Sequence, residues 1–222
     1  MDFQRQREAL FGGELTKLGI RSPRVLRAML EVPREEFVPP EFRESSYQNV
    51  ALPIELGQTI SQPLIVAEMI EAMRLSVDDR VLEIGTGSGY GAAILSRIVR
   101  DVYTVERHAA LADAAKELYE RLGYSNVHVH VGDGSLGWPE YAPYEAIVVT
   151  AAAPCVPEPL LKQLSIGGRL VIPIGETYES QKLVRVTRKG TENFRTKELC
   201  RVRFVPLIGE AGWHDSDDVP TV

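Results

Sequence analysis

The sequence has few cysteines, no long apolar segment and no excess of basic residues. Only two of its 222 residues are cysteine, too few for a framework of disulfides. The first residues lack a basic flank followed by an apolar run, so they do not resemble a signal peptide, and no apolar run reaches the length of a membrane span. The formal net charge of −6 argues against a surface that binds nucleic acid. We therefore expect a cytoplasmic protein that binds neither membranes nor nucleic acid.

Hydrophobic residues make up 44% of the chain, which is enough for one domain with a sizeable core. From residue 81 onward, short β-branched or apolar runs alternate with helical patterns, which is typical of a doubly wound parallel α/β sheet. The expected strands cover 81–84, 102–105, 127–131, 146–150 and 169–172, and the expected helices cover 90–99, 108–122 and 158–165. Two later runs, 182–187 and 197–205, have no helix between them, so we predict an antiparallel pair at the sheet edge.

Residues 1–75 are predicted to form a helical extension and an ordered loop. Helices are expected over 4–20, from Pro23 to just before Pro33 with Ser22 as N-cap, and over 64–73. The segment 37–63 holds several prolines but also apolar residues, so we expect an ordered, functional loop. Residues 76–213 would form the α/β core and 214–222 a flexible tail, all within a single domain.

A glycine-rich turn follows the first expected strand. It reads Glu83-Ile84-Gly85-Thr86-Gly87-Ser88-Gly89-Tyr90. Ligands of open α/β sheets bind beyond the carboxyl ends of the strands, and glycine lets the backbone approach them closely. The pattern is GxGxG, because Tyr90 occupies the position where a dinucleotide fingerprint requires its third glycine.

Acidic residues at three strand ends favour a nucleoside ligand. Glu106 ends the second strand, where a carboxylate accepts hydrogen bonds from ribose hydroxyls. Asp133 follows the third strand, where it is placed to contact an adenine edge, although Asp-Gly is also a common turn. Glu83 would repel a pyrophosphate and favour an ammonium or sulfonium group. S-adenosylmethionine carries both of these cations.

The segment 51–63, with Gln58-Thr59-Ile60-Ser61-Gln62-Pro63 at its end, resembles the signature of protein-L-isoaspartate O-methyltransferases. The resemblance extends over nearly the whole chain, through the segments 18–20, 24–39, 81–90, 132–134, 147–152 and 203–207. It implies a seven-stranded class I methyltransferase (Rossmann-like) sheet with antiparallel edge strands and an N-terminal helical extension. It also implies S-adenosyl-L-methionine as cofactor and methylation of the α-carboxylate of L-isoaspartyl residues in damaged proteins and peptides, which starts repair through a succinimide.

The resemblance also implies roles for particular residues. Ser61 matches the family's active-site serine, and a peptide substrate is expected to lie in extended form along Val205 to Leu207, with Thr59 near Ser61. The expected cofactor contacts are Glu83, Gly85, Thr86, Gly87, Ser88, Gly89, Glu106, Arg107, Asp133, Gly134 and Thr150. No metal is expected. The sequence departs from the family at three places, namely Gly91 for a common glutamine, Glu145 for the usual aspartate, and Glu55-Leu56 for a frequent Gly–aromatic pair.

This reaction needs positioning more than acid–base chemistry. A free α-carboxylate, with a reference pKa of about 3.5, is already ionised near neutral pH. Catalysis then consists chiefly of orienting the carboxylate and excluding water, and a serine hydroxyl suits that task. Ser61 has an alternative role as N-cap of the helix that begins near Pro63 or Leu64.

Other functions fit the sequence less well. An NAD-dependent oxidoreductase would also use Glu106, but Tyr90 argues against it. Nucleic-acid methylation is disfavoured by the negative charge and by the lack of an Asn/Asp-Pro-Pro-aromatic motif. His128 and His130 share a strand face without further residues at metal-ligand spacing. A non-catalytic binding module and a carboxyl methyltransferase dedicated to one peptide stay open as alternatives, and we expect a monomer.

Overall fold

The computed structural model describes residues 2–177 and 180–214, so most of the predicted tail, 215–222, lies outside the described residues. Its centre is a seven-stranded sheet in the order β5-β4-β3-β6-β7-β8-β9. The strands are β3 (Arg80–Ile84), β4 (Asp101–Glu106), β5 (Val127–Val131), β6 (Tyr144–Val149), β7 (Leu164–Ile174), β8 (Lys182–Arg188) and β9 (Phe194–Arg201). The first five strands of this order are parallel, and β8 runs antiparallel to β7 and β9. The predicted fold class is therefore confirmed.

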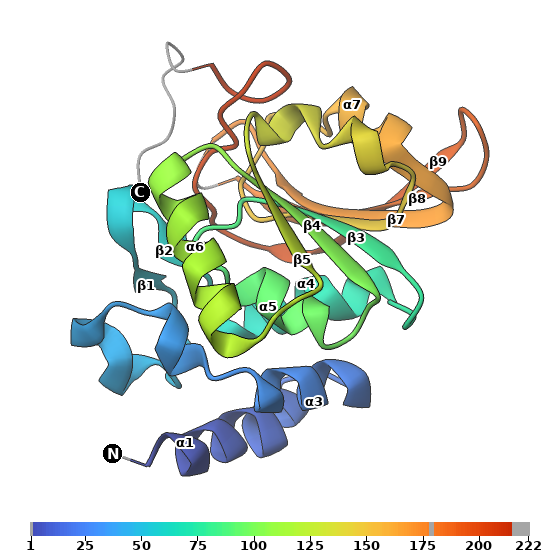
Figure 1. Ribbon diagram of the computed structural model, residues 1–222. Helices are drawn as coiled ribbons and strands as arrows, with labels where there is room; N and C mark the ends of the chain where they lie inside the picture. The colour runs from blue at the N-terminus through green and yellow to red at the C-terminus, as the bar shows by residue number, and fades with distance from the viewer. Residues whose placement is uncertain (1, 178–179, 215–222) are drawn as a thin grey trace.

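Helices cover both faces of the sheet, and the N-terminal helices form a further layer beyond α4 and α5 (Figure 1). The helices are α1 (Phe3–Ala9), α2 (Leu15–Lys17), α3 (Pro23–Glu31), α4 (Pro63–Met73), α5 (Tyr90–Ser96), α6 (Ala109–Leu122) and α7 (Glu158–Gln163). Successive strand residues point to opposite faces. Val81 and Val148 therefore belong to the core on the α4 and α5 side, whereas Leu82 and Ile147 belong to the core on the α7 side. Among the described helices, none is long and apolar enough to cross a membrane.

Two predicted elements differ from the observed ones. The expected single helix over 4–20 is interrupted by a π-helical segment, Leu10–Glu14, which contains two glycines of low helix propensity. The last strand ends at Arg201 and not near 205, because the side chain of Gln181 binds the chain beyond it. Gln181 Nε2 donates to the Phe204 carbonyl at 3.0 Å, and the Phe204 N–H donates to Gln181 Oε1 at 2.6 Å. These bonds lead 205–207 away from the sheet edge.

The predicted loop over 37–63 is ordered. It contains short 3-10 segments and a hairpin of β1 (Leu52–Pro53) and β2 (Thr59–Ile60). A part-buried network of side chains fastens this region to α1. Arg7 donates to the Tyr47 hydroxyl at 2.8 Å and pairs with Glu35 at 2.9 Å, and the Tyr47 hydroxyl donates to Glu35. The N-terminal extension is thereby held against the loop that precedes α4.

Candidate active site

A cavity opens at the carboxyl ends of β3, β4 and β6, where strand order reverses and ligands of doubly wound sheets bind. With its mouth it encloses about 1170 Å³. Segments distant in the sequence line it, among them the β1–β2 hairpin with Ser61, helix α4, the glycine-rich turn, residues 105–108 and residues 205–208. Its lining combines apolar side chains with a few polar groups, as is usual for ligand pockets.

Most predicted site residues line this cavity. They are Thr59, Ser61, Glu83, Gly85, Thr86, Gly87, Ser88, Glu106, Arg107, Gly134, Thr150, Val205 and Leu207. These residues are neighbours in space although they come from segments that lie far apart in the sequence. The topology of the parallel strands brings them together at one edge of the sheet.

The carboxylate of Glu106 lies at the end of β4 and is only 5% exposed. Its two oxygens accept hydrogen bonds from the backbone N–H of Gly87, at 2.9 Å, and of His108, at 3.0 Å. Glu106 therefore fixes the glycine-rich turn against the end of the neighbouring strand. Each carboxylate oxygen can accept a further bond, so the group retains acceptor capacity toward the cavity.

Glu83 is almost fully buried in the cavity wall. Burial raises the pKa of its carboxyl group to about 8, the hydrogen bond from Thr104 opposes this rise, and the charge of Glu106 adds to it. The Thr104 hydroxyl donates to Glu83 at 2.7 Å. A cationic ligand group beside Glu83 would stabilise its ionised form, so the site suits an ammonium or sulfonium group better than an anion.

The turn after β3 requires glycine at position 85. Gly85 has a φ of +93°, and a Cβ atom there would lie 2.3 Å from Thr150 Oγ1. Thr150 Oγ1 is held in that place because it donates a hydrogen bond to the Gly85 carbonyl at 2.8 Å. The two residues lock the end of β3 to the end of β6, and both face the cavity.

The opposite wall carries hydroxyl groups. Ser61 is half-buried and lines the cavity, and its hydroxyl has no hydrogen-bond partner among the residues that the structure describes. Helix α4 begins at Pro63 with Gln62 at the N-cap, so Ser61 does not cap it. The capping alternative is therefore wrong, and the hydroxyl is available to a ligand.

The segment from Val205 to Leu207 runs beside Ala152 at the cavity mouth. The Ala152 N–H donates to the Val205 carbonyl and the Leu207 N–H donates to the Ala152 carbonyl, both at 2.7 Å. This extended backbone is fixed on one edge by β-type pairing, as expected for a segment that supports a bound peptide.

The structure does not place Asp133 or Gly89 in the cavity wall. Asp133 Oδ1 accepts from the N–H and hydroxyl of Ser135, at 2.9 and 2.7 Å, and Oδ2 accepts from the Glu210 N–H at 2.7 Å. These bonds hold the chain after Ile208 against the end of β5. The turn role that the sequence left open is thus observed, and a contact with adenine stays a prediction.

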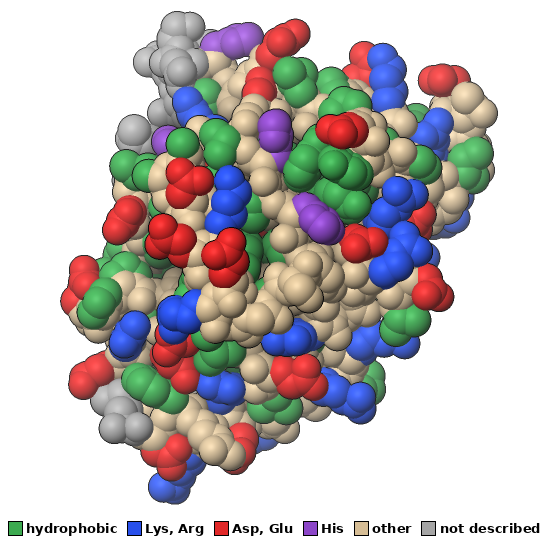
Figure 2. All heavy atoms as spheres, viewed as in Figure 1, with side chains coloured by type: hydrophobic (Ala, Val, Ile, Leu, Met, Phe, Trp, Pro, Cys, Tyr) green, Lys and Arg blue, Asp and Glu red, His purple; other side chains and the backbone are tan. Residues whose placement is uncertain are grey.

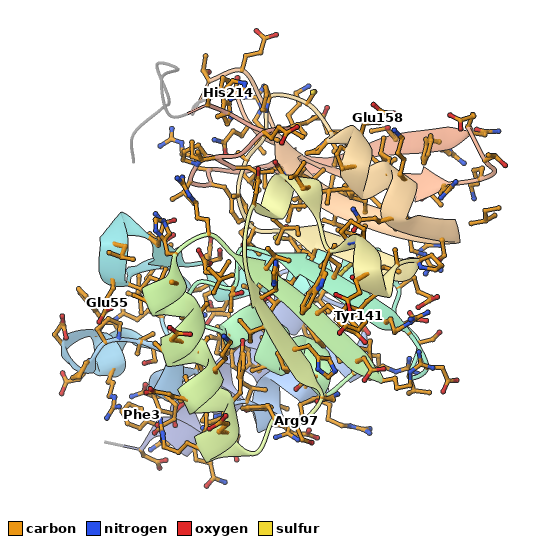
Figure 3. The ribbon with its side chains drawn as sticks, turned by 45° about the horizontal axis from the view of Figure 1, so that its top comes forward. Phe3, Glu55, Arg97, Tyr141, Glu158 and His214 are labelled. Carbon is orange, nitrogen blue, oxygen red and sulfur yellow. The ribbon has the colours of Figure 1, made fainter. Side chains whose placement is uncertain are left out.

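The three departures from the family pattern lie in different places. Glu145 Oε2 accepts from the Arg80 N–H at 2.8 Å, at the start of β3 and away from the cavity. Leu56 lies at the tip of the β1–β2 hairpin, 54% exposed and with φ of +57°, beside Glu55 at the outer edge of the molecule (Figure 3). Gly91 lines the cavity, and a Cβ atom there would lie 2.3 Å from Glu83 Oε1. Gly91 thus leaves room for the Glu83 carboxyl group.

Sequence reasoning missed several cavity residues. His108, which the sequence pattern did not single out, lines the cavity beside Glu106. Gln58 and the apolar Val66 and Ile70 of α4 also line it. A helix pattern predicts that apolar side chains are buried but not which cavity they face.

On the visible face of the molecule, acidic and basic side chains are interspersed (Figure 2), so the negative charge of the cavity wall is a local feature.

Fold and cavity together define a class I methyltransferase. A solved protein-L-isoaspartate O-methyltransferase matches with a TM-score of 0.83 and 36% identity, over 93% of this chain and 67% of that chain. A Plasmodium falciparum structure assigned to the same enzyme class, in complex with S-adenosyl-L-homocysteine, matches with a TM-score of 0.79 and 26% identity, over 91% and 98% of the two chains.

The chain belongs to the protein-L-isoaspartate(D-aspartate) O-methyltransferase family, whose model matches residues 5–212. It is 64% identical to a protein-L-isoaspartate O-methyltransferase 1 of Geotalea uraniireducens, over 94% of this chain and 95% of that protein. It is 60% identical to a protein-L-isoaspartate O-methyltransferase 2 of Pelobacter propionicus, over 94% and 92%. The cofactor of the family is S-adenosylmethionine. The wall of this cavity carries acidic groups, which disfavour a ligand with phosphate groups, so the wall fits that molecule.

Replacing Glu106 with alanine is expected to weaken binding of S-adenosylmethionine by roughly ten- to a hundredfold, through loss of charge-assisted hydrogen bonds. The Gly87 N–H would also lose its acceptor. Isothermal calorimetry measures the affinity, and Glu117→Ala, on the exposed face of α6, is the matched control. Unchanged affinity in the Glu106 variant would remove the residue from the cofactor site.

The affinity for S-adenosylmethionine should also depend on pH through Glu83. Its carboxyl group, with a pKa of about 8, is mostly protonated near neutral pH, and a cation favours the ionised form. Binding therefore releases a proton, and affinity rises with pH up to about 8. We expect the ratio of wild-type to Glu83→Gln affinity to rise by up to about tenfold per pH unit below that value. The ratio cancels titration of the ligand's own amino group, and a constant ratio would contradict the assignment.

Proposed function

We propose that this cavity binds S-adenosylmethionine against the Glu83 and Glu106 wall and an isoaspartyl carboxylate against the Ser61 wall. The observation that carries this proposal is that Ser61 lines the cavity and that its hydroxyl has no hydrogen-bond partner among the described residues. A carboxylate oxygen placed there can accept its hydrogen bond.

When bound, the cofactor supplies an electrophilic methyl group. The residues of the chain then have two tasks. Ser61 donates a hydrogen bond that orients the carboxylate without protonating it. Val66, Ile70 and Leu95 give the cavity apolar walls that exclude water. No residue needs to act as general base, because the carboxylate is already ionised.

The peptide that carries the carboxylate is proposed to lie along Val205 to Leu207. Support comes from the extended, edge-paired backbone of this segment and from its place at the cavity mouth. Thr59, on the wall of Ser61, is a second hydroxyl within the same site. Arg107, Gly134 and Thr150 complete the proposed cofactor contacts on the sheet side.

We propose the cellular location, the partners and the oligomeric state of the protein from its composition. Cys155 and Cys200 are free thiols, as expected in the reducing cytoplasm. The net charge of −6 and the mixture of charges on the visible face disfavour nucleic acid as a partner. We propose a cytoplasmic monomer that acts on isoaspartyl proteins and peptides and does not bind membranes.

Replacing Ser61 with alanine tests this proposal. We expect the rate of methyl transfer in a single turnover to fall by about 30- to 1,000-fold, equivalent to about 2–4 kcal/mol, by analogy with the loss of one oxyanion donor. The melting temperature and cofactor affinity should stay close to those of the wild type, because Ser61 caps no helix.

Ser165→Ala, a half-buried serine on β7, is the control for the same chemical change away from the cavity. A Ser61→Ala protein with a wild-type rate would show that the hydroxyl does not orient the carboxylate.

A further inference from the structure

Arg34 is a fully buried cation close to the cavity. Its side chain is 0% exposed. Nε donates to the Ser46 carbonyl and Nη2 donates to the Ser61 carbonyl, both at 2.9 Å. The guanidinium carbon lies 4.7 Å from the centre of the Tyr90 ring. Nη1 has no hydrogen-bond partner among the described residues.

This charge is not neutralised by a carboxylate. The adjacent Glu35 is engaged by Arg7 and by the Tyr47 hydroxyl, and Arg34 forms no ion pair with a described residue. Burial lowers the pKa of Arg34, which reflects the cost of removing the cation from water. Apolar side chains in such places are often as stabilising as the charged group, or more so. Stability alone therefore does not explain an arginine here.

The contacts of Arg34 join two walls of the cavity. Ser61 lies on the wall proposed to bind the carboxylate, and Tyr90 is the first residue of α5, directly after the glycine-rich turn. The planar guanidinium reaches both, with one edge on the Ser61 backbone and one face on the Tyr90 ring. Arg34 itself is not part of the cavity wall.

We propose that Arg34 is a positioning residue that sets the distance between the Ser61 segment and the helix after the glycine-rich turn. In-line methyl transfer requires the carboxylate and the methyl donor to meet at a fixed separation, and a misplacement of about 1 Å can lower a rate by about a hundredfold. Because Arg34 binds the Ser61 carbonyl, it fixes the backbone of Ser61 and therefore the point from which the Ser61 side chain extends. This inference rests on the role proposed above for Ser61.

The test compares Arg34→Met, Arg34→Lys and the wild type. Methionine fills much of the space without the charge or the donors. We expect kcat with an isoaspartyl peptide to fall by about 10- to 100-fold, with the KM for S-adenosylmethionine changed less than about threefold. Arg34→Lys keeps the charge and one donor and should recover part of kcat. The melting temperature of Arg34→Met should stay within about 3 °C of the wild type.

Arg185→Met is the matched control. Arg185 also donates to a backbone carbonyl, that of Ala72 at 3.2 Å, and burial lowers its pKa, but Ala72, unlike Ser61, does not line the cavity. Its kcat should equal that of the wild type. If Arg34→Met does not fold, Arg34→Lys provides the comparison, and a wild-type kcat in that variant would overturn the proposal.

A double-mutant cycle with Ser61→Ala shows whether Arg34 acts through Ser61. We expect Arg34→Met to reduce kcat much less in the Ser61→Ala background than in the wild type. Equal losses in both backgrounds would overturn the proposal, as would a wild-type kcat in Arg34→Met. A joint loss of cofactor affinity and thermal stability would assign Arg34 a purely structural role. If Ser61→Ala alone is fully active while Arg34→Met is impaired, the role of Ser61 fails and so does this proposal, because nothing remains for Arg34 to position.

Discussion

Two carboxyl groups on one wall of a single cavity, Glu83 and Glu106, set the electrostatic constraint on which the rest of the site depends. Burial makes the Glu83 carboxyl group costly to ionise and raises its pKa to about 8, and the charge of Glu106 adds to that cost. A cationic ligand relieves that cost, whereas an anion would increase it. In the proposed arrangement this wall favours a methyl donor that carries positive charge, and the anionic acceptor binds elsewhere in the cavity.

The segment with Thr59 and Ser61 is proposed to receive that acceptor, and it brings no formal charge to the cavity. Hydroxyl groups of Thr59 and Ser61 face the cavity, and the cation of Arg34 lies behind them, bonded to the Ser61 carbonyl. A hydroxyl donor orients a carboxylate but does not trap it as a surface arginine would through a bidentate pair. The acceptor oxygen can then keep the electron density that it needs for attack.

Much of this arrangement could be predicted from the sequence because it follows local rules. Short apolar runs separated by helices predicted the parallel strands, and the GxGxG turn and Glu106 then fell at adjacent strand ends by topology alone. Ser22 before Pro23 likewise predicted the start of α3, where its side chain accepts from the Val25 N–H.

Other features depend on contacts that no local pattern encodes. Arg34 is followed by two glutamates in the sequence, and only the folded chain brings the Ser46 and Ser61 carbonyls and the Tyr90 ring around it. Asp133 follows a strand, but the hydrogen bonds that it accepts from Ser135 and from the Glu210 N–H, far along the chain, could not be predicted from the sequence, and its contact with adenine stays a prediction. The last strand was misplaced for a similar reason, since one glutamine side chain, Gln181, ends it.

The most direct test of the central claim is methyl transfer from S-adenosylmethionine to two peptides that are identical except for isoaspartate or aspartate at one position. The proposed binding of an α-carboxylate in this cavity, with the peptide along Val205 to Leu207, predicts methyl ester formation on the isoaspartyl peptide and none above background on the aspartyl peptide. Equal transfer to both peptides, or transfer to neither, would contradict it.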